Sequence, residues 1–91
     1  MNVIFRCDGS KLIGMGHIER CLTLAKYIKK NYRAEITFAM RKSEIGISKV
    51  KKYFSVIKSV EKNFNYSNWM NECIYNFNAK ILILDVRDGL K

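Results

Sequence analysis

The chain's only histidine, His17, directly follows a short turn that contains two glycines, Gly14 and Gly16. An imidazole can give or take a proton near neutral pH, and a glycine backbone lets a ligand approach closely. The turn lies where an apolar strand gives way to an amphipathic helix, so unpaired N–H groups at the helix start favour phosphate or carboxylate. The same helix dipole disfavours a charged ring, which predicts a neutral imidazole that can accept a proton from water or a hydroxyl.

Two simpler interpretations of this motif stay open. The third glycine of a dinucleotide-binding fingerprint is missing, because Glu19 stands there, and the Lys-Ser/Thr pair of a phosphate-binding loop is absent. Gly14-Met15-Gly16 could therefore be a tight turn with no ligand. His17 could be a helix-start residue that only hydrogen-bonds its own loop.

Strand-like and helix-like segments alternate along the chain. Within the first helix, apolar residues recur every three or four positions and predict one buried stripe: Ile18, Cys21, Leu22, Ala25 and Ile28. The expected strands are Val3–Phe5 with Asn2 and Arg6 at its edges, Glu35–Met40, Ser55–Val60 and Ile81–Leu84. The expected helices run from Gly16 to Lys30, from a Ser43 cap to about Tyr53 or Phe54, and from a Ser67 cap to about Phe77.

This alternation indicates an α/β fold with a doubly wound parallel sheet and right-handed crossovers. The expected strand order is 3-2-1-4, a Rossmann-like three-layer open sheet. The continuous apolar run Ile81–Leu84 is typical of a central strand covered on both faces. The first and fourth strands would then end side by side, near Asp8 and Asp85, at the edge where such sheets bind ligands. His17 would stand at the mouth of that crevice.

Length and composition narrow the class of protein. The 91 residues suffice for one domain, and 48% hydrophobic residues supply a small core. No apolar run is long enough for a membrane span or a signal peptide, so we expect a cytoplasmic protein. The sequence stops at Lys91, just after an apolar strand. We therefore expect residues 1–91 to form one partial Rossmann-like domain of a larger protein.

Charge and cysteine content point to no cofactor. The net charge of +9 allows binding to nucleic acid or to another anionic partner. The lysines are nevertheless spread along the chain without a nucleic-acid-binding motif, which favours a solvated surface. A single histidine and widely spaced Cys7, Cys21 and Cys73 predict no metal site and no disulfide framework. Cys21 and Cys73 fit core positions, whereas Cys7, expected in the loop, could be a reactive thiol.

The opening residues resemble a known enzyme family. The matching positions are Phe5-Arg6, Asp8, Ser10, Ile13-Gly14, Gly16-His17, Arg20 and Leu24-Ala25. The pattern is similar to that of the UDP-2,4-diacetamido-2,4,6-trideoxy-L-altropyranose hydrolases of pseudaminic acid biosynthesis. Their relatives include spore-coat polysaccharide biosynthesis proteins and, more broadly, the GT-B glycosyltransferases. The match is close over the first 25 residues and loose from there to Asp85.

The resemblance implies an N-terminal sugar-side domain and a C-terminal domain, absent from this sequence, that binds most of the UDP. It implies that His17 is catalytic, and that water attacks the anomeric carbon of a UDP-sugar and releases UDP. Gly14, Met15 and Gly16 would offer backbone N–H groups to the substrate. Asp8 would accept hydrogen bonds from the sugar or would stabilise the loop, and both roles stay open.

One position departs from the hydrolase pattern. That pattern has Asp-His-Tyr after the fourth strand, whereas this chain has Asp85-Val86-Arg87. The change favours the spore-coat-like relatives over the trideoxy-sugar hydrolases. Arg87 could bind a carboxylate or phosphate, or could be a plain surface residue. The alternatives to a nucleotide-sugar enzyme are a basic nucleic-acid-binding module and a folded fragment without activity.

Overall fold

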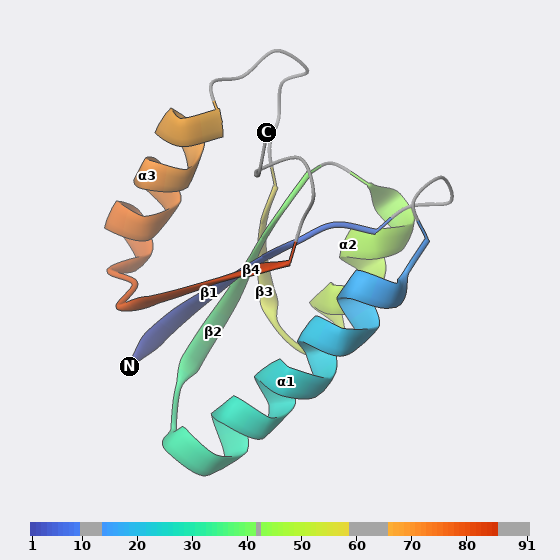
Figure 1. The fold of residues 1–91 in the computed structure, drawn as a ribbon, viewed down its shortest axis with the longest axis horizontal. Helices are drawn as coiled ribbons and strands as arrows, with labels where there is room; N and C mark the ends of the chain where they lie inside the picture. The colour runs from blue at the N-terminus through green and yellow to red at the C-terminus, as the bar shows by residue number, and fades with distance from the viewer. Residues whose placement is uncertain (10–13, 42, 59–65, 86–91) are drawn as a thin grey trace.

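The computed structural model describes residues 1–9, 14–41, 43–58 and 66–85. These residues form alternating strands and helices (Figure 1). In chain order the elements are β1 (Asn2–Cys7), α1 (Gly16–Tyr32), β2 (Glu35–Met40), α2 (Glu44–Lys51), β3 (Ser55–Lys58), α3 (Tyr66–Phe77) and β4 (Ile81–Asp85). The described strands make one parallel sheet in the order β3-β2-β1-β4, which confirms the predicted α/β class and the predicted order 3-2-1-4.

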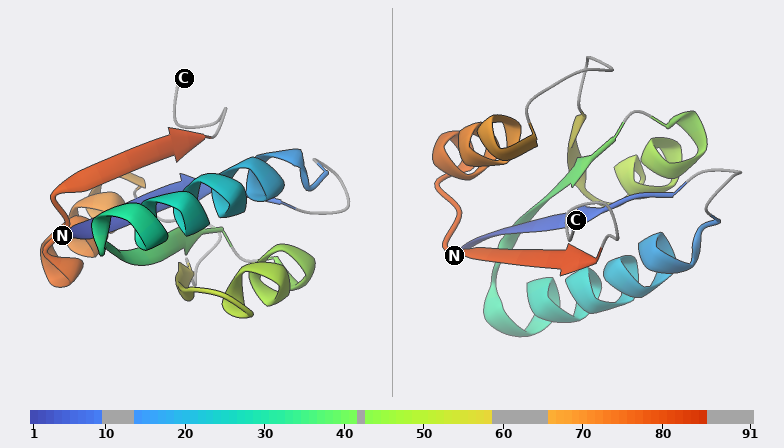
Figure 2. Two further views of the ribbon diagram at one scale, coloured as in Figure 1. Left: turned by 90° about the horizontal axis from the view of Figure 1, so that it is seen from below. Right: turned by 45° about the horizontal axis from the view of Figure 1, so that its top comes forward.

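The helices cover the sheet in two layers, so the domain has a Rossmann-like layout. Helices α1 and α2 pack on one face and α3 on the other (Figure 2). Strand β1 alternates between the two layers, because successive side chains of a strand point to opposite faces. Val3, Phe5 and Cys7 belong to the α1/α2 side, and Ile4 packs with Met70 of α3 on the other side.

The larger core is built around stacked aromatic rings. The ring of Phe38 in β2 lies 5.1 Å from the ring of Phe5 in β1 and 5.5 Å from that of Phe54, measured between centroids. All three side chains are buried. The predicted stripe of α1 supplies the facing surface, with Ile18, Cys21, Leu22 and Ala25 buried and Ile28 partly buried.

Several helix boundaries differ from the predicted ones. Ser43 caps α2 as predicted, with its Oγ accepting from the Gly46 N–H at 3.4 Å, but α2 ends at Lys51 rather than near Phe54. The N–H groups of Tyr53 and Phe54 both donate to Val50 O, so the chain turns there and carries Phe54 into the core. Helix α1 continues two residues beyond Lys30. The prediction of a Ser67 cap was wrong, because α3 already begins at Tyr66.

The outer strands also differ from expectation. Strand β3 is a half-exposed edge strand, as predicted, and residues 59 and 60 of its predicted span lie outside the described residues. The prediction of a covered central fourth strand was wrong for the described sheet, in which β4 is an edge strand. Ile81, Leu82 and Leu84 are 42%, 36% and 54% exposed. A continuous apolar run reports hydrophobicity but not a strand's place in the sheet.

Truncating Phe38 to Ala tests the importance of the stacked core. We expect Phe38→Ala to lower the free energy of unfolding by about 3–5 kcal/mol, because it opens a cavity between two aromatic rings. Urea denaturation followed by circular dichroism measures this loss. Tyr75→Ala is the matched control, since Tyr75 is 85% exposed on α3, and it should change stability by less than about 0.5 kcal/mol. Equal losses for the two variants would contradict this description of the core.

Candidate functional site

The turn before α1 is open to solvent. Gly14 has a φ of +81°, a conformation that side-chain-bearing residues rarely adopt, so glycine is required here by the backbone. Gly14 and Gly16 are both exposed, and no described atom lies within 4 Å of where a Cβ would stand on either residue. The backbone at both glycines is therefore accessible to a ligand.

Helix α1 starts directly after this turn, with Met15 as its N-cap residue. Met15 O accepts a hydrogen bond from the Glu19 N–H at 3.0 Å. Within the described part of the chain, the Met15 side chain makes no capping hydrogen bond, and it packs partly buried against the core. The first-turn N–H groups thus receive no cap from Met15, which leaves the positive end of the helix suited to an anion.

A close contact between β1 and the two helices sets the position of this helix start. A Cβ on Gly9 would stand 2.2 Å from Ile18 Cδ1, and a Cβ on Gly46 would stand 2.6 Å from the carbonyl oxygen of Gly9. The clash at Gly46 is with backbone, so a glycine is needed there for the chain after β1 to pass this close to α2. Sequence reasoning missed both roles, although a glycine inside a predicted helix such as Gly46 is a signal of close packing.

His17 lies in the first turn of α1, half-buried, beside the exposed glycine turn. Its Nδ1 is 2.8 Å from Nη2 of Arg20, one helical turn further on. A guanidinium has N–H donors and no acceptor, so Arg20 donates and Nδ1 accepts. The contact therefore requires a lone pair on Nδ1.

Asp8 joins the carboxyl ends of two strands. Its Oδ1 lies 2.8 Å from Nη1 of the buried Arg6 and also accepts the backbone N–H of Arg41 at 2.8 Å. The Arg6 guanidinium also lies 5.4 Å from the ring centre of Trp69 in α3. A buried cation needs a carboxylate partner, so these contacts favour the loop-stabilising role for Asp8.

The remaining predicted site residues are only partly placed. Asp85 is the last residue of β4 and pairs in register with Cys7, so β1 and β4 end side by side as predicted. Arg87 lies outside the described residues, as do Ser10 and Ile13 of the family-like opening pattern. The structure thus brings together Asp8, the backbone of Asp85 and the start of α1 at one end of the sheet.

The cysteines do not form a reactive centre. Cys7 is the last residue of β1 and fully buried, so the prediction of a loop thiol was wrong. A hydrogen bond with Cys21, together with burial, raises the pKa of the Cys7 thiol far above its usual value. Burial also raises the pKa of Cys73. All three cysteines are free, and the described residues contain no group of ligands suited to a metal ion.

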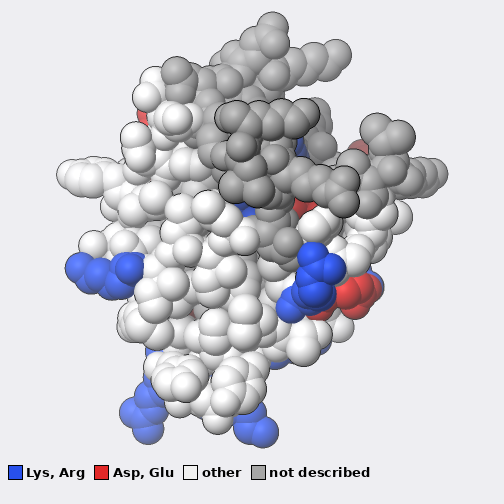
Figure 3. All heavy atoms as spheres, in the orientation of Figure 1, with Lys and Arg blue, Asp and Glu red and all other residues white. Residues whose placement is uncertain are grey.

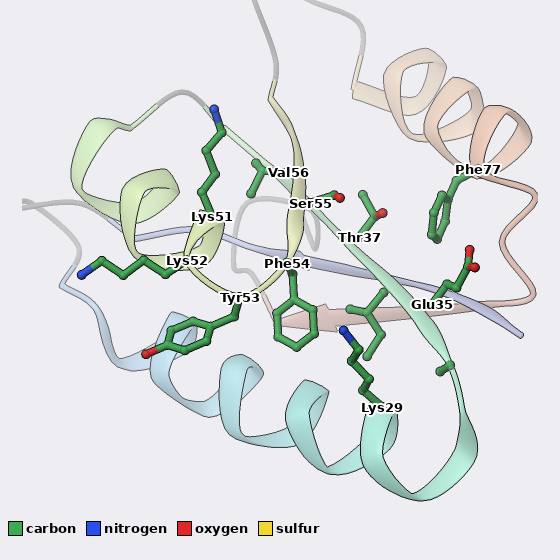
Figure 4. A pocket seen from close by; sticks show the side chains of 12 residues that line it. Lys29, Glu35, Thr37, Lys51, Lys52, Tyr53, Phe54, Ser55, Val56 and Phe77 are labelled. Carbon is green, nitrogen blue, oxygen red and sulfur yellow. The ribbon is translucent and has the colours of Figure 1, made fainter.

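On the face shown in Figure 3, the Lys and Arg side chains stand apart from one another. A separate open groove of about 720 Å³ lies at the amino ends of β2 and β3, lined in part by Lys29, Lys51 and Tyr53 (Figure 4). The amino ends of the strands are at the opposite end of the sheet from the start of α1, where His17 lies. No helix among the described residues is long and apolar enough to cross a bilayer.

Comparison with known proteins finds a longer relative. The chain is similar to the uncharacterized protein MJ1062 of Methanocaldococcus jannaschii, with 34% identity over 86 residues. The match covers 93% of this chain but 17% of that protein. The chain therefore spans less than a fifth of the length of the relative it matches. No protein-family model matches the chain, and no solved structure matches it.

The two glycines of the turn make a matched pair for testing the backbone geometry. A Cβ meets no described atom within 4 Å at either position, so the variants differ mainly in φ. Gly14→Ala should lower the free energy of unfolding by about 1–2 kcal/mol, because alanine is strained at positive φ. Gly16→Ala, at the helix start, should be neutral or stabilise by up to about 1 kcal/mol. Thermal or urea unfolding measures both, and a Gly14→Ala variant as stable as Gly16→Ala would contradict the turn geometry.

Removing the Asp8 carboxylate tests whether Asp8 supports the fold. Asp8→Ala should lower the free energy of unfolding by about 3–5 kcal/mol, because the buried Arg6 charge loses this partner. The control is Glu19→Ala, which removes a more exposed ion pair with Lys49 and should cost less than about 1 kcal/mol. Urea denaturation distinguishes the two variants. An Asp8→Ala protein with the unfolding free energy of the wild type would contradict the supporting role and favour ligand binding by Asp8.

Proposed function

We propose that this chain is the N-terminal, sugar-side part of a GT-B-type nucleotide-sugar hydrolase or related glycosyltransferase. Its pathway would be surface polysaccharide or nonulosonic acid biosynthesis. The observation that carries the proposal is the position of His17, in the first turn of α1 and beside an exposed glycine turn. An anion-binding helix start and an imidazole on the same turn suit a substrate that joins a sugar to a diphosphate.

The opening pattern of the chain supports the choice of enzyme family. The glycines, His17 and Arg20 of that pattern all lie at the turn or in the first helical turns of α1. The parallel sheet in the order 3-2-1-4 is the layout that the N-terminal domain of such an enzyme would need. The relative is much longer than this chain. The proposal adds a second, nucleotide-binding domain after this one.

The proposed reaction is hydrolysis at the anomeric carbon. The oxygen of a water molecule forms a bond to that carbon as the bond from the carbon to the diphosphate oxygen breaks. UDP leaves with the electron pair, and the proton released from water passes to solvent. His17 would orient or deprotonate the water, and the N–H groups of Gly14, Met15 and Gly16 would bind substrate oxygens. The diphosphate is a good leaving group and needs mainly stabilisation of its charge.

The other predicted residues keep supporting roles in this proposal. Asp8 would reach the sugar only through an oxygen that its contacts with Arg6 and Arg41 leave available, so its main role is to hold the strand ends in place. Asp85 and Arg87 would contact the sugar or its phosphate. No metal or cofactor takes part in the proposed reaction.

Replacing His17 tests the proposed activity. The protein should be produced with every residue that its reading frame encodes, and UDP release from a set of UDP-sugars should be measured. His17→Ala should lower the rate of UDP release by about a hundredfold or more, because proton transfer or water orientation is lost. Lys30→Ala, at the far end of the same helix, is the control and should keep the full rate. Undiminished turnover in His17→Ala would exclude His17 as the catalytic residue.

A further inference from the structure

We propose that Arg20 is a positioning residue that holds His17 in one neutral form, with its proton on Nε2. The observation is the 2.8 Å distance between Nη2 of Arg20 and Nδ1 of His17. The guanidinium can only donate, so Nδ1 must carry a lone pair. A protonated imidazole has N–H groups on both nitrogens and cannot make this contact. Of the two neutral tautomers, only the one with hydrogen on Nε2 can.

The helix favours this pairing. Residues three apart lie on the same side of an α-helix, so the backbone of α1 brings Arg20 to the His17 ring. A hydrogen bond from a charged donor is also stronger and shorter than a neutral one, which favours a fixed ring orientation.

This tautomer changes what His17 can do. With Nδ1 accepting from Arg20 and the proton on Nε2, the ring carries a hydrogen-bond donor and has no lone pair for abstracting a proton. His17 would then bind an oxygen, such as a diphosphate oxygen or the oxygen of the attacking water. This consequence rests on the proposed function and narrows it from proton abstraction to orientation and charge stabilisation. The tautomer itself does not depend on that function.

The tautomer can be measured directly in the 91-residue chain. Because the sequence has one histidine, ¹⁵N-labelled protein gives a single set of imidazole signals. At a pH where the ring is neutral, Nδ1 should show the chemical shift of an unprotonated nitrogen. A scalar coupling across the hydrogen bond should link Nδ1 to an Arg20 guanidinium nitrogen. A protonated Nδ1 would overturn the proposal.

Variants separate the effect of Arg20 from that of charge in general. Arg20→Met keeps a long, helix-favouring side chain but has no donor, so the shifts of the two ring nitrogens should move toward each other as the tautomers mix. Arg20→Lys, which keeps a donor and the charge, should restore part of the difference. Glu19→Gln changes a neighbouring charge that pairs with Lys49, and should leave the ring signals in place. Ring signals unaffected by Arg20→Met would overturn the proposal.

A kinetic measurement shows whether the tautomer matters for the proposed activity. In the protein produced with its whole reading frame, Arg20→Met should lower kcat about tenfold with little change in KM, because a misplaced ring weakens an interaction made in the transition state. A shifted tautomer with unchanged kcat would support the positioning role and refute its catalytic consequence. If the tautomer shifts as expected but the wild-type protein releases no UDP, the proposed function fails while the tautomer assignment stands.

Discussion

Strand β1 is the constraint on which the rest of the described structure depends. It pairs with β2 on one side and with β4 on the other, and residues 3–7 are fully buried. Both helical layers pack against it, and the same short segment ends at the candidate site. A strand so enclosed has a fixed register, because a slip by one residue would move its apolar side chains to the opposite face. The fixed end of β1 therefore fixes where the following turn and α1 begin.

The end of β1 contains an unusual combination of a buried cation and close backbone packing. Arg6 is fully buried and is held by Asp8, which also bonds the chain just after β2. Gly9 then packs against Ile18 and Gly46, and a Cβ on Gly46 would stand 2.6 Å from the backbone oxygen of Gly9. Burying the Arg6 charge costs free energy, and so does fixing the backbone in this close packing. They leave the start of α1 exposed but firmly placed, as a binding site on a rigid scaffold requires.

Periodic patterns predicted most of the fold. The alternation of strands and helices, the strand order and the Ser43 cap follow from local sequence, because hydrophobic spacing and helix-start chemistry act over a few residues. Other features depend on tertiary contacts. Helix α2 ends early because Phe54 is drawn into an aromatic stack, and Cys7 is buried because β1 extends further than its apolar residues indicate. The apolar sequence of β4 could not reveal that it lies at an edge of the described sheet.

The candidate site was predictable in position but less so in chemistry. The sequence placed His17 beside a glycine turn, and the φ of Gly14 explains that turn. It did not predict that Arg20 donates to Nδ1, because the contact depends on which side-chain rotamers two neighbours adopt. The sequence also left two roles open for Asp8, sugar binding and loop stabilisation. The ion pair with Arg6 favours loop stabilisation.

Binding of a nucleotide sugar at the start of α1 is the central claim of this account. The most direct measurement is a titration with UDP-N-acetylglucosamine of ¹⁵N-labelled protein produced with every residue that its reading frame encodes, followed through its backbone amide signals. The account predicts shifts concentrated at Gly14, Gly16 and His17, with the signals of Lys51 and Tyr53 at the opposite edge unchanged. Shifts confined to that lysine-lined edge, or no shift at millimolar ligand, would contradict it.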